Sequence, residues 1–471
     1  MKKLNIQAAL LLFMGAMCAM QVKAQSIEAL LSETAPPIAD KKSSPIKEFY
    51  KYSELRAYEM TLANGLHIVL RADEGREDVL MTAICPGGAS LADDQDFQSA
   101  IHAGAIIGNS GFATASGSEV ASFLAQKNIS LSPGIEEKYS TLKGRFLQAD
   151  LETFLQAITL YFSRPRKDKT YFDAYIKKLK ADALARRKHP YDRFQDTVAA
   201  LLSTNKSRIS LLSADRIKQI NLDKAFEIYQ RCFGNANGYT FIFTGDFKTD
   251  AHNQPSHEKM NLLARYLGAL SSSTAAQQVI DRKAGIPGGN HFKEVYNSKA
   301  RAAAVQMVYS GDYLHTDSVM LQLKVLSYLV EKNLDSLLGQ AGADKPSVTL
   351  HASKFPKPVY SINISFQCPP KQADQMVALA QQVIANLKAG VDAEQIKQYV
   401  YMRKQELKKQ TFDYAFWRDY LALQFMNHDD PYDIVHYPYN FYKASGQSLQ
   451  QAAKEFLTDT NYVQAILRPS K

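Results

Sequence analysis

The feature that most constrains this sequence is an internal repeat with a period of roughly 200 residues. The stretch VLMTAICPGGASLADD in the first half resembles AAAVQMVYSGDYLHTD in the second. In both halves an apolar helical pattern, a break and a long charged helical pattern follow, and each half ends with a helix, a polar turn and a strand. The period is too long for a solenoid. The repeat therefore predicts two copies of one α+β domain.

The composition between the copies predicts the domain boundaries. A small, polar stretch that contains glycine and proline separates them at residues 271–288, as is typical of a linker. The first domain is predicted to span residues 56–270 and the second residues 289–471. Residues 25–55 are polar and carry paired prolines, which indicates an extended leader or linker.

Hydrophobic periodicity predicts the main elements of the first copy. Strands are indicated in TLANGLHIVLR, with Asn64 and Gly65 as a turn, and in DVLMTAICPGG and TFIFTGDF. Helical patterns run over about residues 150–161 and 171–188.

The N-terminal segment predicts export. Residues 1–24 combine a basic start, MKK, with an interrupted apolar run and an ending, VKA, that resembles an A-x-A cleavage site. This order is typical of a secretory signal peptide. The apolar run is too short to span a bilayer comfortably, so we expect no transmembrane segment.

Charge and cysteine usage exclude some classes of protein. The formal net charge is +9, but the basic residues are spread out and none forms a patch interleaved with aromatic residues. A nucleic-acid partner is therefore not expected. Cys85, Cys232 and Cys368 are far apart and have apolar neighbours, which indicates buried free thiols instead of a disulfide framework.

No motif in the sequence supplies a catalytic apparatus. The histidines form neither H-E-x-x-H nor H-x-x-E-H, and no G-x-S-x-G or phosphate-binding loop is present. Ser110, Ser116 and Ser118 lie in the loop GNSGFATASGSE, without a histidine in a defined relation to them. A turn explains this loop best, and an enzyme with one of these serines as nucleophile stays open as an alternative. From the residues alone, the chain is an exported two-domain α+β protein.

Taken in order, the segments resemble the insulinase/pitrilysin (inverzincin) metallopeptidase family, which includes the mitochondrial processing peptidases. The resemblance runs through NGLHIVLR, CPGGASLADDQDFQSA, YQRCFGNANGYTFIFTGDF and SVTLHASKFPKPVYSINISFQC, and covers nearly everything from residue 56 to 471. It implies two homologous α/β-sandwich domains of the insulinase type that form half a clamshell. The chain most resembles the non-catalytic second half of the long two-half bacterial members.

The same resemblance implies a degenerate zinc site. Active members carry H-x-x-E-H on a helix, where histidines four residues apart bind zinc and the glutamate acts as general base. These positions fall on His102, Ala105 and Ile106, so only the first histidine remains. Active members also use a glutamate from a downstream helix, and this sequence offers only Asp182 there. We therefore expect no catalytic and no metal-binding residue, and a packed or hydrogen-bonded His102.

A second site that the family uses is also altered. The second domain of active members brings an arginine and a tyrosine toward the substrate, where they polarise the scissile carbonyl. The aligned stretch here is LLGQAGADKPSVTLHAS, and the two positions fall on Gly339 and Pro346. Neither residue has a side-chain donor.

The resemblance implies a non-catalytic subunit that pairs with a separate, exported H-x-x-E-H chain and closes a chamber around peptide substrates. Zinc is expected only in that partner, so the chain itself would need no cofactor. The periplasm is the expected location. The alternative is an exported peptide-binding or scaffold protein that works alone and cuts nothing.

Overall fold

The structure is a computed structural model that describes residues 27–36, 45–73, 75–247 and 255–469. The predicted signal peptide, residues 1–24, lies outside the described residues. None of the described helices is both long enough and apolar enough to cross a membrane.

The chain divides into two compact units that exchange segments. Unit 1 contains Met1–Lys178, Ile217–Ile280 and Asp413–Asp429. Unit 2 contains Leu179–Arg216, Asp281–Phe412 and Asp430–Lys471. Each unit therefore includes a segment from the other half of the sequence. Neither unit is a single continuous stretch of the chain.

Unit 1 is built on a seven-stranded sheet with the order β1-β2-β3-β9-β4-β8-β7. β3 and β9 are parallel, and the other neighbours are antiparallel. The strands are β1 (Ile46–Tyr52), β2 (Ala57–Leu62), β3 (His67–Ala72), β4 (Asp78–Pro86), β7 (Ser130–Ile135), β8 (Tyr139–Leu147) and β9 (Thr240–Gly245). A short hairpin, β5 (Gly111–Phe112) and β6 (Ala115–Ser116), lies outside this sheet.

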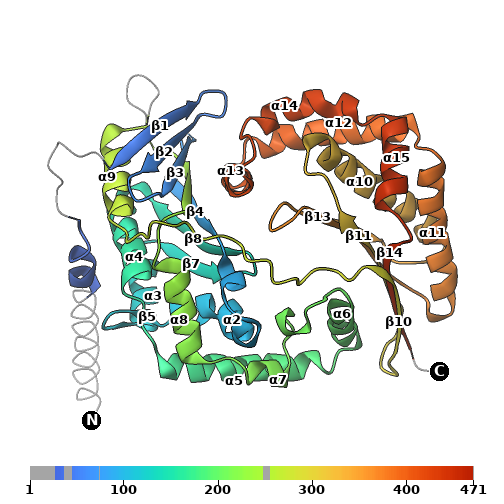
Figure 1. Cartoon of the computed structure of the whole chain (residues 1–471), viewed down its shortest axis with the longest axis horizontal. Coiled ribbons are helices and arrows are strands. Elements are labelled where there is room, and N and C mark those ends of the chain that lie inside the picture. The colour runs from blue at the N-terminus through green and yellow to red at the C-terminus, as the bar shows by residue number, and fades with distance from the viewer. Residues whose placement is uncertain (1–26, 37–44, 74, 248–254, 470–471) are drawn as a thin grey trace, which may run out of the picture. The chain divides into compact units, whose positions relative to one another are not determined.

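Helices cover the two faces of this sheet unequally (Figure 1). Most of them pack on one face, where Phe146 and Phe154 stack with ring centroids 4.1 Å apart. The other face is covered by α13 (Tyr414–Asn427), through a buried cluster of Val69, Ile242, Leu421 and Ala422. The remaining helices of this part of the sequence are α2 (Phe97–Gly108), α3 (Gly117–Gln126), α4 (Leu151–Ser163), α5 (Lys169–Arg186), α7 (Ala214–Ile217), α8 (Leu222–Phe233) and α9 (His257–Gly268).

Unit 2 repeats the arrangement on five strands, in the order β10-β14-β11-β13-β12. The strands are β10 (Gly289–Tyr296), β11 (Ala303–Asp312), β12 (Ser347–Ser353), β13 (Val359–Cys368) and β14 (Asn461–Arg468). One face packs on the main core, and α6 (Pro190–Leu201) covers the other through Phe194 and Val198. The further helices are α10 (Asp317–Gln340), α11 (Ala373–Ala389), α12 (Ala393–Gln410), α14 (Asp433–Asn440) and α15 (Gly446–Phe456).

The two sheets share one topology. In unit 1 the last strand, β9, lies between β3, to which it is parallel, and β4, to which it is antiparallel. In unit 2 the last strand, β14, lies in the same way between the parallel β10 and the antiparallel β11. β8 and β7 then follow in unit 1, as β13 and β12 do in unit 2. This agreement confirms the α+β fold class and the prediction of two homologous domains.

Most local predictions in unit 1 are also confirmed. The predicted turn at Asn64 and Gly65 joins β2 to β3, and Gly65 adopts φ of 80°, a conformation that favours glycine. One expectation is corrected, because residues 46–52 of the predicted leader form β1. β1 is paired with β2, although most of its side chains are exposed. Such a strand lacks the hydrophobic alternation that sequence reading needs.

Candidate functional site

The helix α2 carries the residues at the predicted degenerate zinc site. Its small residues let it approach β7 closely. A Cβ atom added at Gly104 would lie 2.9 Å from the carbonyl oxygen of Pro133, and one added at Gly108 would lie 2.1 Å from the Cγ of Pro133. The run of small and apolar residues in this helix thus has a packing cause.

His102 lies half-buried on α2 and contacts α5. Its Nδ1 shares a hydrogen bond of 2.8 Å with the hydroxyl of Tyr175, and the two rings meet edge to face. Burial lowers the pKa of His102. Burial, with a smaller contribution from Tyr171, raises the pKa of Tyr175 to about 12. Both side chains are therefore neutral near pH 7, as a packed hydrogen-bonded pair requires.

The other two positions predicted for the zinc motif carry no metal-ligating side chain. Ile106 is fully buried in the core of unit 1. Ala105 is half-buried, and its carbonyl oxygen accepts hydrogen bonds from Asn109 Nδ2 at 2.8 Å and from the Tyr171 hydroxyl at 3.5 Å. The described residues contain no group of three or more His, Cys, Asp or Glu side chains that could hold a metal ion.

The structure adds two residues that the sequence did not single out, Tyr171 and Tyr175. They lie one turn apart on α5, their rings are stacked with centroids 6.3 Å apart, and both contact α2. Asp182, the only acid that the sequence offered for a third ligand, is exposed further along the same helix. The tyrosine spacing of four residues is a helical-face signal, but nothing in the sequence indicated that this face meets His102.

The two positions of the predicted substrate site lie in unit 2. Gly339 is exposed near the C-terminal end of α10, and a Cβ added there would meet nothing within 4 Å. Pro346 is buried directly before β12. Neither supplies a side-chain hydrogen-bond donor to a substrate.

The serines of the loop 108–119 have structural partners. Ser116 caps α3 in a reciprocal capping box with Glu119, and the buried Ser110 donates to the carbonyl oxygen of Ile106 at 2.8 Å. A capping role explains Ser116 without catalysis. The predicted buried free thiols at Cys85, Cys232 and Cys368 are confirmed, and burial raises the pKa of Cys232 to about 11.

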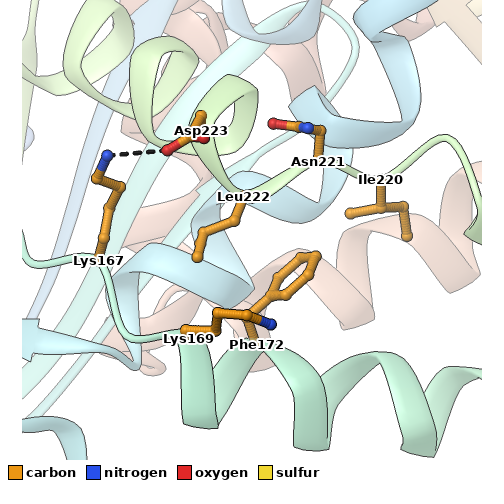
Figure 2. A pocket seen from close by; sticks show the side chains of 7 residues that line it. All are labelled: Lys167, Lys169, Phe172, Ile220, Asn221, Leu222 and Asp223. Atoms are coloured by element: carbon orange, nitrogen blue, oxygen red, sulfur yellow. Dashed lines mark hydrogen bonds and ion pairs between the residues drawn. The ribbon is translucent and has the colours of Figure 1, made fainter.

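An open pocket of about 440 Å³ lies between the start of α5 and the start of α8 (Figure 2). Lys167 and Asp223 form an ion pair of 2.9 Å across it, and Lys169 pairs with Asp173 at 2.8 Å. The lining residues are Lys167, Lys169, Phe172, Ile220, Asn221, Leu222 and Asp223. This set contains neither a histidine nor a cysteine, and each of its three charged side chains is in an ion pair.

The fold is similar to that of one half of an M16, or insulinase-type, peptidase, and the sequence of α2 does not contain H-x-x-E-H. No family model matches the chain. The crystal structure of the periplasmic protease PqqL from Escherichia coli superposes with a TM-score of 0.79 at 18% identity. The match covers 93% of this chain and 47% of that one.

Two further comparisons show the same similarity. A peptidase M16 inactive domain from Pseudomonas fluorescens matches with a TM-score of 0.73 at 13% identity, over 88% of this chain and 98% of that chain. The Zinc protease PQQL-like of Arabidopsis thaliana is 22% identical over 407 residues, which is 81% of this chain and 39% of the relative. The chain thus spans about two fifths of that relative's length. The predicted resemblance to insulinase-type peptidases is confirmed.

Proposed function

We propose that this chain is a non-catalytic subunit of an insulinase-type peptidase, which pairs with a zinc-bearing H-x-x-E-H chain to enclose peptide substrates. Zinc would be bound only by the partner. Export, and the periplasm as location, belong to the same proposal, and the description of Escherichia coli PqqL as a periplasmic protease supports them.

The observation that carries the proposal is the state of α2. One imidazole remains where the motif needs two, its Nδ1 is engaged by Tyr175, and the general-base position is Ala105. A catalytic zinc site needs three protein ligands and an open position for water. With a single histidine and no carboxylate, this arrangement can neither hold zinc tightly nor accept the proton from a bound water.

The length of the match supports a paired role. The structural match covers 93% of this chain but only 47% of the PqqL chain. A second chain of similar size would therefore complete an assembly of the length of PqqL. The substrate-side positions Gly339 and Pro346 have no donors, so the partner would supply the groups that act on the scissile bond.

Peptide binding would use the exposed sheet edge of unit 2. β12 lies at that edge, and its side chains from Ser347 to His351 alternate between exposed and half-buried positions. An extended peptide can add to such an edge through main-chain hydrogen bonds. β7, the corresponding edge of unit 1, contains Pro133, which has no N–H to donate.

The test is a pull-down of the tagged full chain from its native cells, followed by mass spectrometry and peptide-hydrolysis assays. We expect an H-x-x-E-H chain in stoichiometric amount and hydrolysis only when both chains are present. The matched control is the partner with its motif glutamate changed to glutamine, which should assemble but not cleave. Hydrolysis by this chain alone would contradict the proposal.

The alternative is a peptide-binding or scaffold protein that acts alone. The similarity to an inactive M16 domain of nearly the same length favours it. If the tagged chain is recovered without an H-x-x-E-H partner but binds extended peptides, this alternative replaces the paired role.

A further inference from the structure

The two units differ at one edge of their otherwise equivalent sheets. In unit 1, β3 is covered by β2, which pairs with it antiparallel. Among the described residues, the equivalent strand of unit 2, β10, is at the edge of its sheet and is paired only with β14. Four of the six side chains in β3 are buried, whereas no side chain in β10 is.

The backbone of β10 presents unpaired groups at this edge. The N–H of Asn297 donates to the carbonyl oxygen of Arg468 on β14 at 2.9 Å. Because backbone groups alternate along a strand, those of Asn290, Phe292, Glu294 and Tyr296 point away from β14. The same alternation of backbone groups is seen in β3 of unit 1. The N–H of His67 donates to the carbonyl oxygen of Tyr239 on the β9 side, and the N–H of Ala72 donates to that of Arg56 on the β2 side.

The exposed edge also carries aromatic side chains. Phe292 is 64% exposed and Tyr296 is 55% exposed. Phe292 contacts Tyr462, with ring centroids 6.0 Å apart, so its ring extends the core face of the sheet outward. An unpaired edge with exposed aromatic residues is a template for another strand.

We propose that β10 pairs antiparallel with β10 of a second copy of this chain, so that the two five-stranded sheets become continuous. In a symmetric antiparallel pair one residue lies opposite itself. With Phe292 at that centre, Asn290 lies opposite Glu294 of the other copy. The residues that exchange backbone hydrogen bonds between the copies are then those whose N–H and C=O groups point away from β14.

Charge excludes two of the possible registers, and the aromatic residue favours the one centred on Phe292. β10 contains one lysine and one glutamate, Lys293 and Glu294. A register centred on either would place like charges directly opposite each other, which destabilises a cross-strand pair. Centring on Phe292 instead brings two aromatic rings together, a favourable cross-strand pair. The inference does not depend on the peptidase role proposed above.

Light scattering coupled to gel filtration, over a range of concentrations of the full chain, tests the proposal. We expect a reversible dimer. Phe292→Lys should raise its dissociation constant at least about tenfold, because two ammonium groups would oppose each other. Phe292→Glu should do the same, and an equimolar mixture of the two variants should form the dimer again. The control, Tyr50→Lys, changes an aromatic residue that is 54% exposed on the edge strand of unit 1 and should leave the dimer intact.

Cysteine cross-linking tests the register. Residues in a hydrogen-bonded antiparallel pair have Cα atoms about 5.5 Å apart, within disulfide range. Phe292→Cys should therefore form a disulfide-linked dimer under mild oxidation, whereas Lys293→Cys should not. A chain that is monomeric at every concentration would overturn the proposal. So would a dimer that persists in Phe292→Lys with its circular dichroism unchanged, or cross-linking by Lys293→Cys alone.

Discussion

At the scale of single residues, the contact between His102 and Tyr175 explains why a lone histidine is retained in an apolar helix. The imidazole is half-buried, and its Nδ1 has a hydrogen-bonding partner. A buried polar atom with a partner avoids the penalty of an unsatisfied one. The histidine therefore needs no metal to be accommodated there.

His102 should make stability depend on pH. Burial lowers its pKa in the folded state, whereas in the unfolded chain it takes up a proton near pH 6.5. Its contribution to stability is therefore fully present above about pH 6.5 and is lost as the pH falls toward the folded-state pKa. We expect His102→Gln to reduce the loss of unfolding free energy between pH 7.5 and 5.5 in urea titrations. An identical pH dependence in the variant and the wild type would show that burial does not perturb this imidazole.

The hydrogen bond itself can be measured separately. Tyr175→Phe removes the hydroxyl and keeps the ring, so we expect a loss of about 1 kcal/mol in unfolding free energy at pH 7. Tyr401→Phe is the matched control, because Tyr401 is 69% exposed on α12. A loss in Tyr401→Phe as large as that in Tyr175→Phe would mean that the His102 contact is not stabilising.

Introducing the ligands of the predicted motif tests whether α2 and α5 have the geometry of a zinc site. The variant Ala105→Glu, Ile106→His, Tyr175→Glu would place two histidines four residues apart and a carboxylate on the facing helix. We expect it to bind one zinc ion per chain, measured by calorimetry, and cobalt with visible absorption. The double variant without Tyr175→Glu should bind more weakly. A folded triple variant without metal affinity would show that α2 and α5 do not have the geometry of a zinc site.

At the scale of elements, each sheet is completed by a helix from the other half of the sequence. α13 covers the outer face of unit 1, where Leu421 is fully buried and the Arg71 guanidinium lies 4.2 Å from the centroid of the Trp417 ring. We expect Leu421→Ala to cost about 2–5 kcal/mol of unfolding free energy. Trp417 is the only tryptophan of the chain, so its fluorescence reports the docking of α13. Leu423→Ala, on the same helix but 49% exposed, should cost far less, and equal losses would contradict this arrangement.

The sequence predicted the helices and strands better than it predicted which of them pack against each other. The turn at Gly65 and the main strands of unit 1 are local patterns, and the repeat is visible by comparing the sequence with itself. The structure confirms all three. The exchange of α6 and α13 could not be predicted, since hydrophobic periodicity shows which face of a helix is buried but not what covers it. The resemblance assigned His102 and Ile106 to positions of the zinc motif. It could not predict the contact of His102 with Tyr175, which is 73 residues away in the sequence.

At the scale of the whole molecule, the proposed assembly predicts two different responses to chelation. The described residues contain no cluster that could hold a metal, so EDTA should leave the unfolding temperature of this chain unchanged. The same treatment should abolish hydrolysis by the assembly with the H-x-x-E-H chain, because the partner's zinc supplies the activated water. Added zinc should then restore hydrolysis without changing the proportion of assembled subunits. A lower unfolding temperature of this chain in EDTA would instead place a metal within it, and the division of roles between the two chains would have to be abandoned.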